Sequence, residues 1–430
     1  MAPEIIGLLG IVLLFVLMAI GMPISFALII PSIFGYLIFV GWDSTMTGMI
    51  SVLSNYVSNY TMSVIPVFIF MGQIAYLSGL MEELYTVSEK WLGRLPGGLA
   101  ISTVFANGFF AACSGSSLAA CIVIGNTAIP QMKKQGYHPY LTYGVVAAAG
   151  TLAALIPPSI IMCIYGLLVD QSITDLFIGG ILPGILSVLL YSAYILFRAR
   201  KFPRSTERYT FKEKVRSVGH LWVVVLLLIS IIYSIYFGWA TPTEAGAVGA
   251  VVVMLLALFT KKLTVKIFFK AVATTVKTTG MILLIICAAA FFGRFLILAG
   301  TTEFIVKSVV MIDASRYVVF ALIGLVYMIL GCFLSATGMM VISLPIFYPI
   351  MMKLGFDPVW FGIIVVIFVE MALITPPVGM NIYAVSSIDT KVPIATIIKG
   401  AAFFLSMDVL TVIILTIFPQ IVTFLPNLMR

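Results

Sequence analysis

Apolar runs of membrane-spanning length follow one another along almost the whole chain, with short polar segments between them. A helix needs roughly 20 apolar residues to cross the hydrocarbon of a bilayer, with a range of about 17 to 25. By this measure the pattern predicts a series of spanning helices. The predicted spans are 4–20, 24–41, 62–80, 174–197, 219–238, 244–260 and 279–299, and a long final run covers 394–425.

Two further apolar stretches are interrupted by proline. The stretch 140–169 contains Pro157-Pro158, and the stretch 358–388 contains Thr375-Pro376-Pro377. Proline lacks a backbone N–H and clashes with the preceding turn, so a helix kinks or ends at such a place. We therefore predict two broken helices.

Two other stretches, 98–130 and 318–350, are too long for one span and too short for two spans with a turn. Small polar residues lie near their centres, at Ser114-Gly115-Ser116-Ser117 and at Ser335-Ala336-Thr337-Gly338. This pattern predicts re-entrant hairpins, because non-helical backbone is tolerated at membrane depth only where protein or a watery cavity covers it. The alternative is that the small residues are helix contacts within tilted spans.

The composition agrees with this pattern and excludes several classes of protein. Hydrophobic residues make up 62% of the 430 residues and charged residues 9%, against roughly 45–50% and about 25% in soluble domains. A cytosolic enzyme, a disordered regulator and a small disulfide scaffold are therefore excluded. The net charge of +8 does not indicate nucleic-acid binding, because membrane proteins place basic residues to fix their orientation. We expect the chain to contact the lipid bilayer and no nucleic acid.

Basic residues indicate how the chain is oriented. The segment 198–216 holds eight Lys and Arg against two Glu, which marks it as cytoplasmic by the positive-inside rule. If 98–130 is a hairpin, Lys90 and Lys133 both fall on the cytoplasmic side; a single span would place them on opposite sides. The hairpin topology accounts for the charges better, and it places both termini outside.

An internal repeat relates the two halves of the chain. A shift of 219 positions superposes prolines, glycines and one lysine: Pro23 on Pro242, Pro130 on Pro349, Lys134 on Lys353, Gly136 on Gly355, Pro139 on Pro358 and Pro157-Pro158 on Pro376-Pro377. Because the topology puts Lys134 inside and Lys353 outside, the repeats are inverted. Inverted repeats with paired discontinuities are typical of secondary transporters, whose binding sites lie near the membrane midplane.

We therefore predict an all-α polytopic membrane protein made of two inverted repeats, each with a re-entrant helical hairpin and a broken helix. The N-terminal repeat covers 1–197, with its hairpin at 98–130 and its broken helix at 140–169. A basic cytoplasmic linker follows at 198–218. The C-terminal repeat covers 219–430, with its hairpin at 318–350 and its broken helix at 358–388.

Each hairpin centre is expected to face the broken helix of its own repeat. Hydroxyls, freed carbonyl groups and half-helix ends then meet at two symmetry-related places. Carbonyl oxygens and negative helix C-termini suit a dehydrated Na⁺, while positive helix N-termini suit an anionic substrate group. We expect ion binding there; the alternative is that Ser and Thr only satisfy backbone groups freed beside the prolines.

Several polar residues at membrane depth are further candidates. Arg294 lies in an otherwise apolar span, and its bidentate fork suits a carboxylate substrate. Glu370 could tune cation affinity, relay a proton or pair with Arg294, and Asp408 is a similar acid in the last span. Asn126 and Asn381 are candidate hydrogen-bond donors to substrate, or else contacts between helices.

Enzymatic functions find little support in the sequence. Gly115-Ser116 resembles an intramembrane serine nucleophile, but the two histidines, His138 and His220, fall in predicted loops and no base lies near that serine. There is no P-loop motif, so we expect no ATP-driven step in this chain. A secondary transporter is the favoured class, and an anion channel that uses the hairpins as a filter is an alternative.

Five segments together resemble one known family. They are Gly21–Leu28 (GMPISFAL), Pro66–Gly72 (PVFIFMG), Ala112–Ser117 (ACSGSS), Ile156–Ser159 (IPPS) and Ala240–Gly246 (ATPTEAG). The chain is similar over essentially its whole length to the large membrane subunit of tripartite ATP-independent periplasmic (TRAP) transporters. Each segment alone is a weak signal, but the combination is specific.

The resemblance implies a bacterial inner-membrane importer that is coupled to Na⁺ and moves its hairpin-bearing part like an elevator. It also implies two partners: a small four-helix membrane subunit and a soluble periplasmic substrate-binding protein. We expect the small subunit as a separate chain, because no fused segment precedes Met1. Family substrates are mostly carboxylates, and the resemblance favours sialic acid (N-acetylneuraminate) over C4-dicarboxylates. A self-sufficient Na⁺/carboxylate carrier without a binding protein is an alternative.

The resemblance also implies particular site residues. The Na⁺ sites fall on Ser114, Gly115, Ser116 and Ser117 with Thr151 and Pro157, and on Ser335, Thr337 and Gly338 with Thr375 and Pro376. Apart from the resemblance, we expect substrate contacts at Arg294, Asn126, Asn381, Ser116 and Thr337. Coupling a monoanion to one Na⁺ gives an electroneutral cycle, whereas a second Na⁺ lets the membrane potential act on transport. We therefore expect two or more Na⁺.

Overall fold

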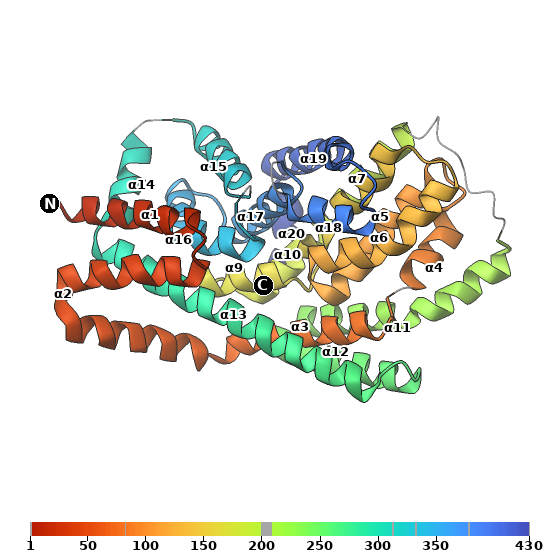
Figure 1. The fold of residues 1–430 in the computed structure, drawn as a ribbon, viewed down its shortest axis with the longest axis horizontal. Coiled ribbons are helices and arrows are strands. Elements are labelled where there is room, and N and C mark those ends of the chain that lie inside the picture. The colour runs from red at the N-terminus through yellow and green to blue at the C-terminus, as the bar shows by residue number, and fades with distance from the viewer. Residues whose placement is uncertain are drawn as a thin grey trace.

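The computed structural model of the chain describes residues 2–81, 83–198, 209–311, 314–331, 333–376 and 379–429. Every regular element in these ranges is a helix (Figure 1). By length and composition, seven of the described helices can cross a membrane, and counting one bent pair as a span raises the number to eight. The predicted all-α polytopic membrane fold is confirmed.

The first half of the chain contains α1 to α10 and one short 3₁₀ helix. Their bounds are α1 (Pro3–Ala19), α2 (Ile24–Val57), η1 (Tyr60–Ser63), α3 (Val64–Leu77), α4 (Glu83–Leu92), α5 (Gly98–Ser114), α6 (Ser117–Lys134), α7 (Pro139–Ala149), α8 (Leu152–Leu155), α9 (Ile160–Val169) and α10 (Ile173–Arg198). Part of the predicted linker, 199–208, lies outside the described residues.

The second half contains α11 to α20. Their bounds are α11 (Phe211–Tyr236), α12 (Pro242–Phe259), α13 (Val265–Leu298), α14 (Thr301–Met311), α15 (Arg316–Leu330), α16 (Ala336–Lys353), α17 (Pro358–Leu373), α18 (Met380–Ile388), α19 (Ile394–Ile417) and α20 (Gln420–Leu428). Helices α6 and α16 begin and end at positions that differ by the same 219 residues as the sequence landmarks.

Local sequence explains where several of these helices begin. At the start of α12, Thr241 caps the helix and Glu244 bonds back to the Thr241 backbone, which forms a capping box with Pro242 at the first helical position. Asp357 caps α17 in a similar way, ahead of Pro358. The prolines therefore fix helix starts as well as helix breaks.

Several predicted spans differ from the observed helices, and three of these differences bear on the architecture. Helix α2 continues past the predicted end of its span and bends at Gly41, whose φ is +77°, a left-handed conformation that glycine adopts at low cost. Helix α13 starts well before the predicted 279–299 span, because the basic segment before it is also helical. The final apolar run divides at Pro419 into α19 and α20.

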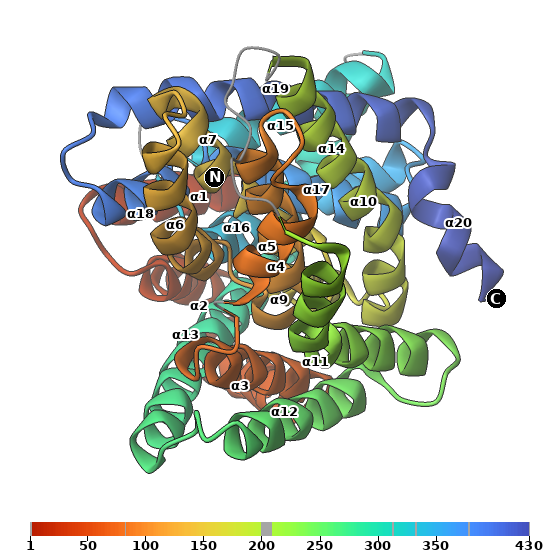
Figure 2. The ribbon, with the colours of Figure 1, turned by 90° about the vertical axis from the view of Figure 1, so that its right-hand side faces the viewer.

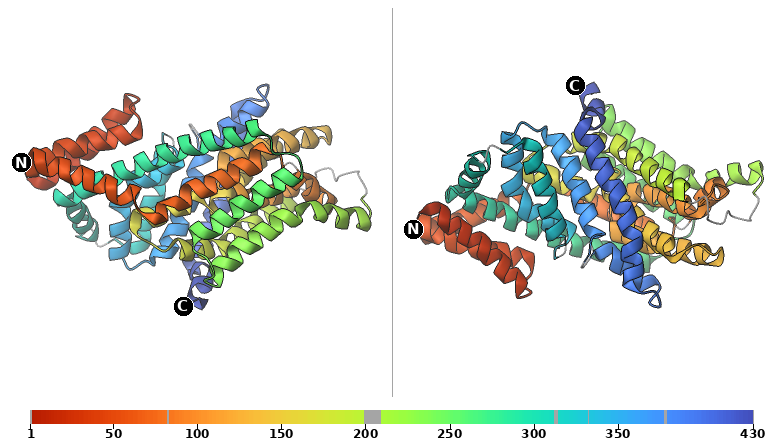
Figure 3. Two further views of the ribbon diagram at one scale, coloured as in Figure 1. Left: turned by 90° about the horizontal axis from the view of Figure 1, so that it is seen from below. Right: turned by 90° about the horizontal axis from the view of Figure 1, so that it is seen from above.

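The helices form two layers. One layer, here called the frame, consists of α1 to α3 and α11 to α13; within it α13 packs on α2 and α3, and α12 packs on α3. The other, here called the hairpin bundle, consists of α5 to α10 and α15 to α19. Figure 2 shows α3, α12 and α13 along one side of the molecule, and the left view of Figure 3 shows them running side by side across it. In the right view of Figure 3, α19 crosses the opposite face.

The two halves pack reciprocally inside the hairpin bundle. Helix α6, the second arm of the first hairpin, packs against α18 of the second half. Helix α16, the second arm of the second hairpin, packs against α9 of the first half. Each hairpin is thus supported by the helix that follows the break of the other repeat.

Contacts between the ends of helices fit the topology predicted from charge. Trp91 Nε1 donates to the Lys214 carbonyl oxygen at 3.2 Å, and Lys262 forms an ion pair with Glu83 at 3.5 Å. These contacts join segments that the charge pattern places on the cytoplasmic side. On the other side, Thr301 Oγ1 donates to the Glu4 carbonyl oxygen at 3.3 Å.

One ion pair ties the far end of α6 to the second half. Lys133 Nζ lies 2.6 Å from Asp389 Oδ2, and the Tyr143 hydroxyl donates to the same oxygen at 2.7 Å. These hydrogen bonds, first the one from Lys133 and then the one from Tyr143, lower the pKa of Asp389 to about 2. The carboxylate therefore stabilises the fold at neutral pH.

We expect Asp389→Asn to lower the free energy of unfolding at pH 7 by less than about 1 kcal/mol, because Lys133 is half exposed. The folded-state pKa is depressed, so the contribution is present above the unfolded pKa of about 3.9 and disappears as the pH falls towards 2. Thermal unfolding of both proteins in detergent at pH 7 and pH 3 measures this. A difference that stays constant with pH would contradict the assignment, and Asp43→Asn, at an exposed position, is the control.

Candidate functional site

Both hairpin tips open onto one cavity of about 570 Å³ between the hairpin bundle and the frame. The first tip contributes Ser114 to Ser117, and the second contributes Ser335 to Thr337. Glu370 near the end of α17 and the first residues of α9 and α18 complete the bundle side. We call this space the tip cavity.

The first tip is a tight reversal between α5 and α6. Gly115 makes the turn with φ of +56°, and a Cβ there would approach the backbone nitrogen of Ile160 to 3.3 Å. Ser116 then caps α6, since its Oγ accepts a hydrogen bond from the Ala119 backbone N–H at 3.4 Å. Ser114 and Ser117 on either side are buried.

The second tip repeats this arrangement. Ser335 caps α16, and its Oγ accepts from the Gly338 backbone N–H at 3.3 Å. Ser116 and Ser335 are related by the 219-residue shift, so equivalent serines cap equivalent helices. Thr337 follows in the first turn of α16 and lines the cavity, whereas Gly338 is buried and does not line it.

The N-termini of α6 and α16 therefore point towards the same cavity. A helix N-terminus carries roughly half a positive charge and several backbone N–H groups without a helical partner. Two such ends at one cavity favour an anionic group such as a carboxylate. The serine caps use some of these N–H groups and leave others for a ligand.

A contact between the two halves closes one wall of the cavity. Ser117 Oγ lies 2.9 Å from both carboxylate oxygens of Glu370, which is 253 positions away in sequence. Ser117 is 8% exposed and Glu370 is 4% exposed. The pairing of Glu370 with Arg294, considered from the sequence, does not occur among the described residues.

The threonines at the two helix breaks make hydrogen bonds outside the tip cavity. Thr151 Oγ1 donates to the Ala148 carbonyl oxygen at 2.6 Å and lies 3.4 Å from the Tyr191 hydroxyl, which in turn donates to Asp408 at 2.7 Å. Thr375 Oγ1 donates to the Met371 carbonyl oxygen at 2.7 Å. Neither threonine lines the tip cavity, and their roles towards Na⁺ stay predictions.

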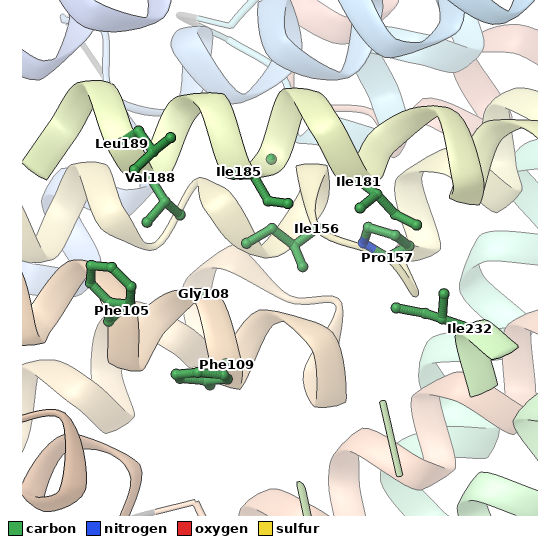
Figure 4. A pocket seen from close by; sticks show the side chains of 11 residues that line it. Phe105, Gly108, Phe109, Ile156, Pro157, Ile181, Ile185, Val188, Leu189 and Ile232 are labelled. Carbon is green, nitrogen blue, oxygen red and sulfur yellow. The ribbon is translucent and has the colours of Figure 1, made fainter. Parts of the chain in front are cut away.

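The prolines of the breaks have different positions. Pro157 lines a separate cavity of about 280 Å³ whose side chains all belong to apolar residues of α5, α10 and α11 and of the break itself (Figure 4). These side chains are apolar, and the role of Pro157 towards Na⁺ stays a prediction. Pro376 is exposed at the second break, and Pro377 lies outside the described residues.

Of the five residues predicted to contact substrate, Ser116 and Thr337 line the tip cavity, and the other three do not. Arg294 on α13 and Asn126 on α6 are exposed in the chain as described. Asn381 on α18 is fully buried and donates through Nδ2 to the Ala147 carbonyl oxygen at 3.3 Å. Their roles towards substrate stay predictions.

Sequence reasoning missed the polar residues that the frame contributes. Ser25, Gln73 and Thr278 line the tip cavity from α2, α3 and α13. The available signal was weak, since Ser25 and Gln73 are single polar residues in apolar runs and Thr278 lies in a polar segment beside Lys277 and Thr279. These side chains give the cavity polar groups on the side opposite the hairpin tips.

The fold and the tip cavity define a class of protein: a polytopic membrane transporter with inverted repeats whose two hairpins meet at one site. Comparison with known proteins identifies the family. The family model for the DctM component of the tripartite ATP-independent periplasmic transporters matches residues 11–421. The chain belongs to this family, and its location is the inner membrane, which it crosses several times.

Individual proteins agree with this membership. The chain is 36% identical over 372 residues to the C4-dicarboxylate TRAP transporter large permease protein of Pseudomonas aeruginosa, covering 86% of this chain and 87% of that protein. It is 28% identical over 434 residues to the sialic acid TRAP transporter large permease protein of Vibrio cholerae, covering 100% and 99%. These relatives are permeases, and the chain is a transporter subunit rather than an enzyme.

A solved structure shares the fold. The YdaH transporter of Alcanivorax borkumensis superposes with a TM-score of 0.60 at 15% identity, over 87% of this chain and 88% of that one. At this identity the likeness concerns the fold alone. It shows that the arrangement of helices described above is one that a membrane transporter uses.

Proposed function

We propose that this chain is the permease of a Na⁺-coupled importer of small carboxylates, and that substrate binds in the tip cavity. The observation that carries the proposal is the convergence of two capped helix N-termini on one cavity, which favours an anion. The division into frame and hairpin bundle supports an elevator movement, in which the bundle carries the cavity past the frame. Hydroxyl and carboxylate oxygens around the tips are the ligands expected for Na⁺.

The proposed transporter works with two partners. The family description names a tripartite, periplasmic transporter of which this chain is one component. A soluble periplasmic substrate-binding protein and a small four-helix membrane subunit, present as a separate chain, are the other two. The binding protein then delivers substrate to the outer side of the permease.

The proposed substrate is defined by its carboxylate. The two relatives above are named for C4-dicarboxylates and for sialic acid, and both substrates carry this group. The sequence resemblance favours sialic acid, while the greater identity is to the dicarboxylate permease. Both substrates therefore belong in the test.

We propose at least two Na⁺ for each substrate molecule. Accumulating a substrate a thousandfold requires about 4.1 kcal/mol, and one net charge crossing 100 mV contributes about 2.3 kcal/mol. A monoanion with two Na⁺ moves one net positive charge inward, and the Na⁺ concentration gradients add the remainder. A dianion needs a third Na⁺ for the same net charge.

The test is uptake into proteoliposomes that contain this chain with and without its two partners. Radiolabelled sialic acid and a radiolabelled C4-dicarboxylate are offered separately, with an inward Na⁺ gradient and with choline in its place. We expect uptake of one of them only when all three proteins and Na⁺ are present.

Other outcomes would contradict the proposal in identifiable ways. Uptake by this chain alone would indicate a self-sufficient carrier. Substrate flux down its own gradient without Na⁺, detected as current, would indicate an anion channel. Uptake that needs all three proteins but does not depend on Na⁺ would support the tripartite assembly and contradict the Na⁺ coupling.

A further inference from the structure

Among the described residues, Glu370 has no basic partner to compensate its charge. The ion pairs within these ranges join Lys133 to Asp389, Lys262 to Glu83 and Lys307 to Glu303. The titratable groups whose charge interacts with Glu370 are Asp408 on α19, Tyr191 on α10 and Cys121 on α6, all acidic or neutral. An uncompensated carboxylate at membrane depth is costly.

The Ser117 hydroxyl only partly satisfies this carboxylate. It lies 2.9 Å from both oxygens, but a hydroxyl has one hydrogen to donate. One carboxylate oxygen therefore lacks a full donor in the part of the chain that the structure describes. A cation that contacts both carboxylate oxygens would remove this deficit.

Helix dipoles do not compensate the charge either. Ser117 begins α6, whose N-terminus contributes roughly half a positive charge. Glu370 lies in the last turn of α17, which ends at Leu373 and contributes a similar negative charge. The partial charges at these two helix ends have opposite signs, so together they do not compensate the formal charge of the carboxylate.

A second buried acceptor belongs to α18, which packs on α6. Asn381 is fully buried, and its Oδ1 has no hydrogen-bond partner within the described ranges. Its Nδ2 donates to the Ala147 carbonyl oxygen at 3.3 Å, and the Cys121 thiol, one turn beyond Ser117 on α6, lies 3.7 Å from that same oxygen. Acceptor oxygens without donors are the environment that a hard cation prefers.

We propose that Glu370 and Ser117 bind a monovalent alkali cation directly at the junction of the two halves, with Asn381 Oδ1 as a further candidate ligand. The site is reached from the tip cavity, which Ser117 and Glu370 both line. This inference rests on the Na⁺ coupling proposed above, and it adds the charged carboxylate of Glu370 to the proposed Na⁺ ligands. The bound cation holds the first hairpin tip to α17, so an empty site weakens the link between the halves.

The experiment measures thermal unfolding of the purified full chain in detergent, in NaCl and in choline chloride at equal ionic strength. Binding to the folded state raises the unfolding temperature. We expect Na⁺ to stabilise the wild type and Asp408→Asn alike, because Asp408, unlike Glu370, does not line the tip cavity. Glu370→Gln should lose the Na⁺-dependent shift, and Glu370→Asp and Ser117→Ala should lower the apparent Na⁺ affinity by about tenfold.

A structural role for Glu370 is distinguished by the measurement in choline. If the carboxylate needs a cation, Glu370→Gln is at least as stable as the wild type in choline, since a neutral amide leaves no uncompensated charge. If Glu370 only accepts a hydrogen bond from Ser117, the variant is less stable in both salts, and the proposal is overturned.

The remaining outcomes separate this inference from the function it rests on. If Na⁺ does not raise the unfolding temperature of the wild type, the proposed Na⁺ coupling itself is wrong. A Na⁺ shift of equal size in the wild type and Glu370→Gln overturns only the assignment of Glu370. Should Glu370→Gln not purify in folded form, equal Na⁺ affinity in the wild type, Glu370→Asp and Ser117→Ala overturns it instead.

Discussion

Gly144→Ala is expected to lower the free energy of unfolding by about 1–3 kcal/mol or more, even though alanine favours helices over glycine by about 1 kcal/mol. Helices α7 and α19 cross with their backbones in contact at Gly144 and Gly400. A Cβ on Gly144 would lie 2.6 Å from the Gly400 Cα, and one on Gly400 would lie 2.9 Å from the Gly144 Cα. Backbone atoms cannot rotate away, so the two helices must separate.

Thermal unfolding in detergent and the yield of folded protein both measure this effect. Gly280→Ala is the matched control, because Gly280 is a helical, exposed glycine and no described atom lies within 4 Å of the place that a methyl group would take there. This change should leave stability unchanged or raise it slightly. Equal stability of the two variants would show that α7 and α19 do not cross closely.

Ser116→Ala and Thr337→Ala should each lower the apparent Na⁺ affinity of uptake by about tenfold or more, and together abolish most Na⁺-driven uptake. Both side chains line the tip cavity, one from each hairpin. Losing one oxygen that contacts a charged group costs about 1.5–3 kcal/mol, and about 1.4 kcal/mol is a factor of ten. Assembly with the partners should be less affected than Na⁺ dependence.

The measurement is the Na⁺ dependence of uptake in proteoliposomes that hold the complete transporter, with co-purification of the partners as the assembly readout. Ser406→Ala is the control, since Ser406 is exposed on α19 and donates to the Phe403 carbonyl oxygen at 2.6 Å. If the Na⁺ affinity is unchanged in both single variants, the hairpin tips do not form the proposed Na⁺ sites.

Proline and glycine made much of the fold predictable, because each restricts or frees the backbone dihedral angles at its own position. Pro139 and Pro358 start α7 and α17, and helix α2 bends at Gly41, where the predicted span ends. The small polar centres likewise marked the two tips. These signals are local, so a single sequence carries them.

The composition of the site was less predictable, because it depends on how the halves pack. The contact of Ser117 with Glu370 spans 253 positions, and no periodicity in either helix indicates it. Arg294 stands out in the sequence because its span is apolar, yet it is exposed and does not line the tip cavity, whereas Gln73 does. A charged residue in an apolar span is a reason to expect a functional role, but the sequence does not show which groups it contacts.

The reciprocal packing of the halves has a consequence for how such a chain could arise. A polypeptide of one half alone would leave the faces of α6 and α9 without the α18 and α16 surfaces that cover them. Exposed helix faces of this kind are covered by pairing with a second copy in the opposite orientation. An ancestor of half this length would therefore have been an obligate antiparallel homodimer, and fusion of its two copies would have fixed their stoichiometry and orientation.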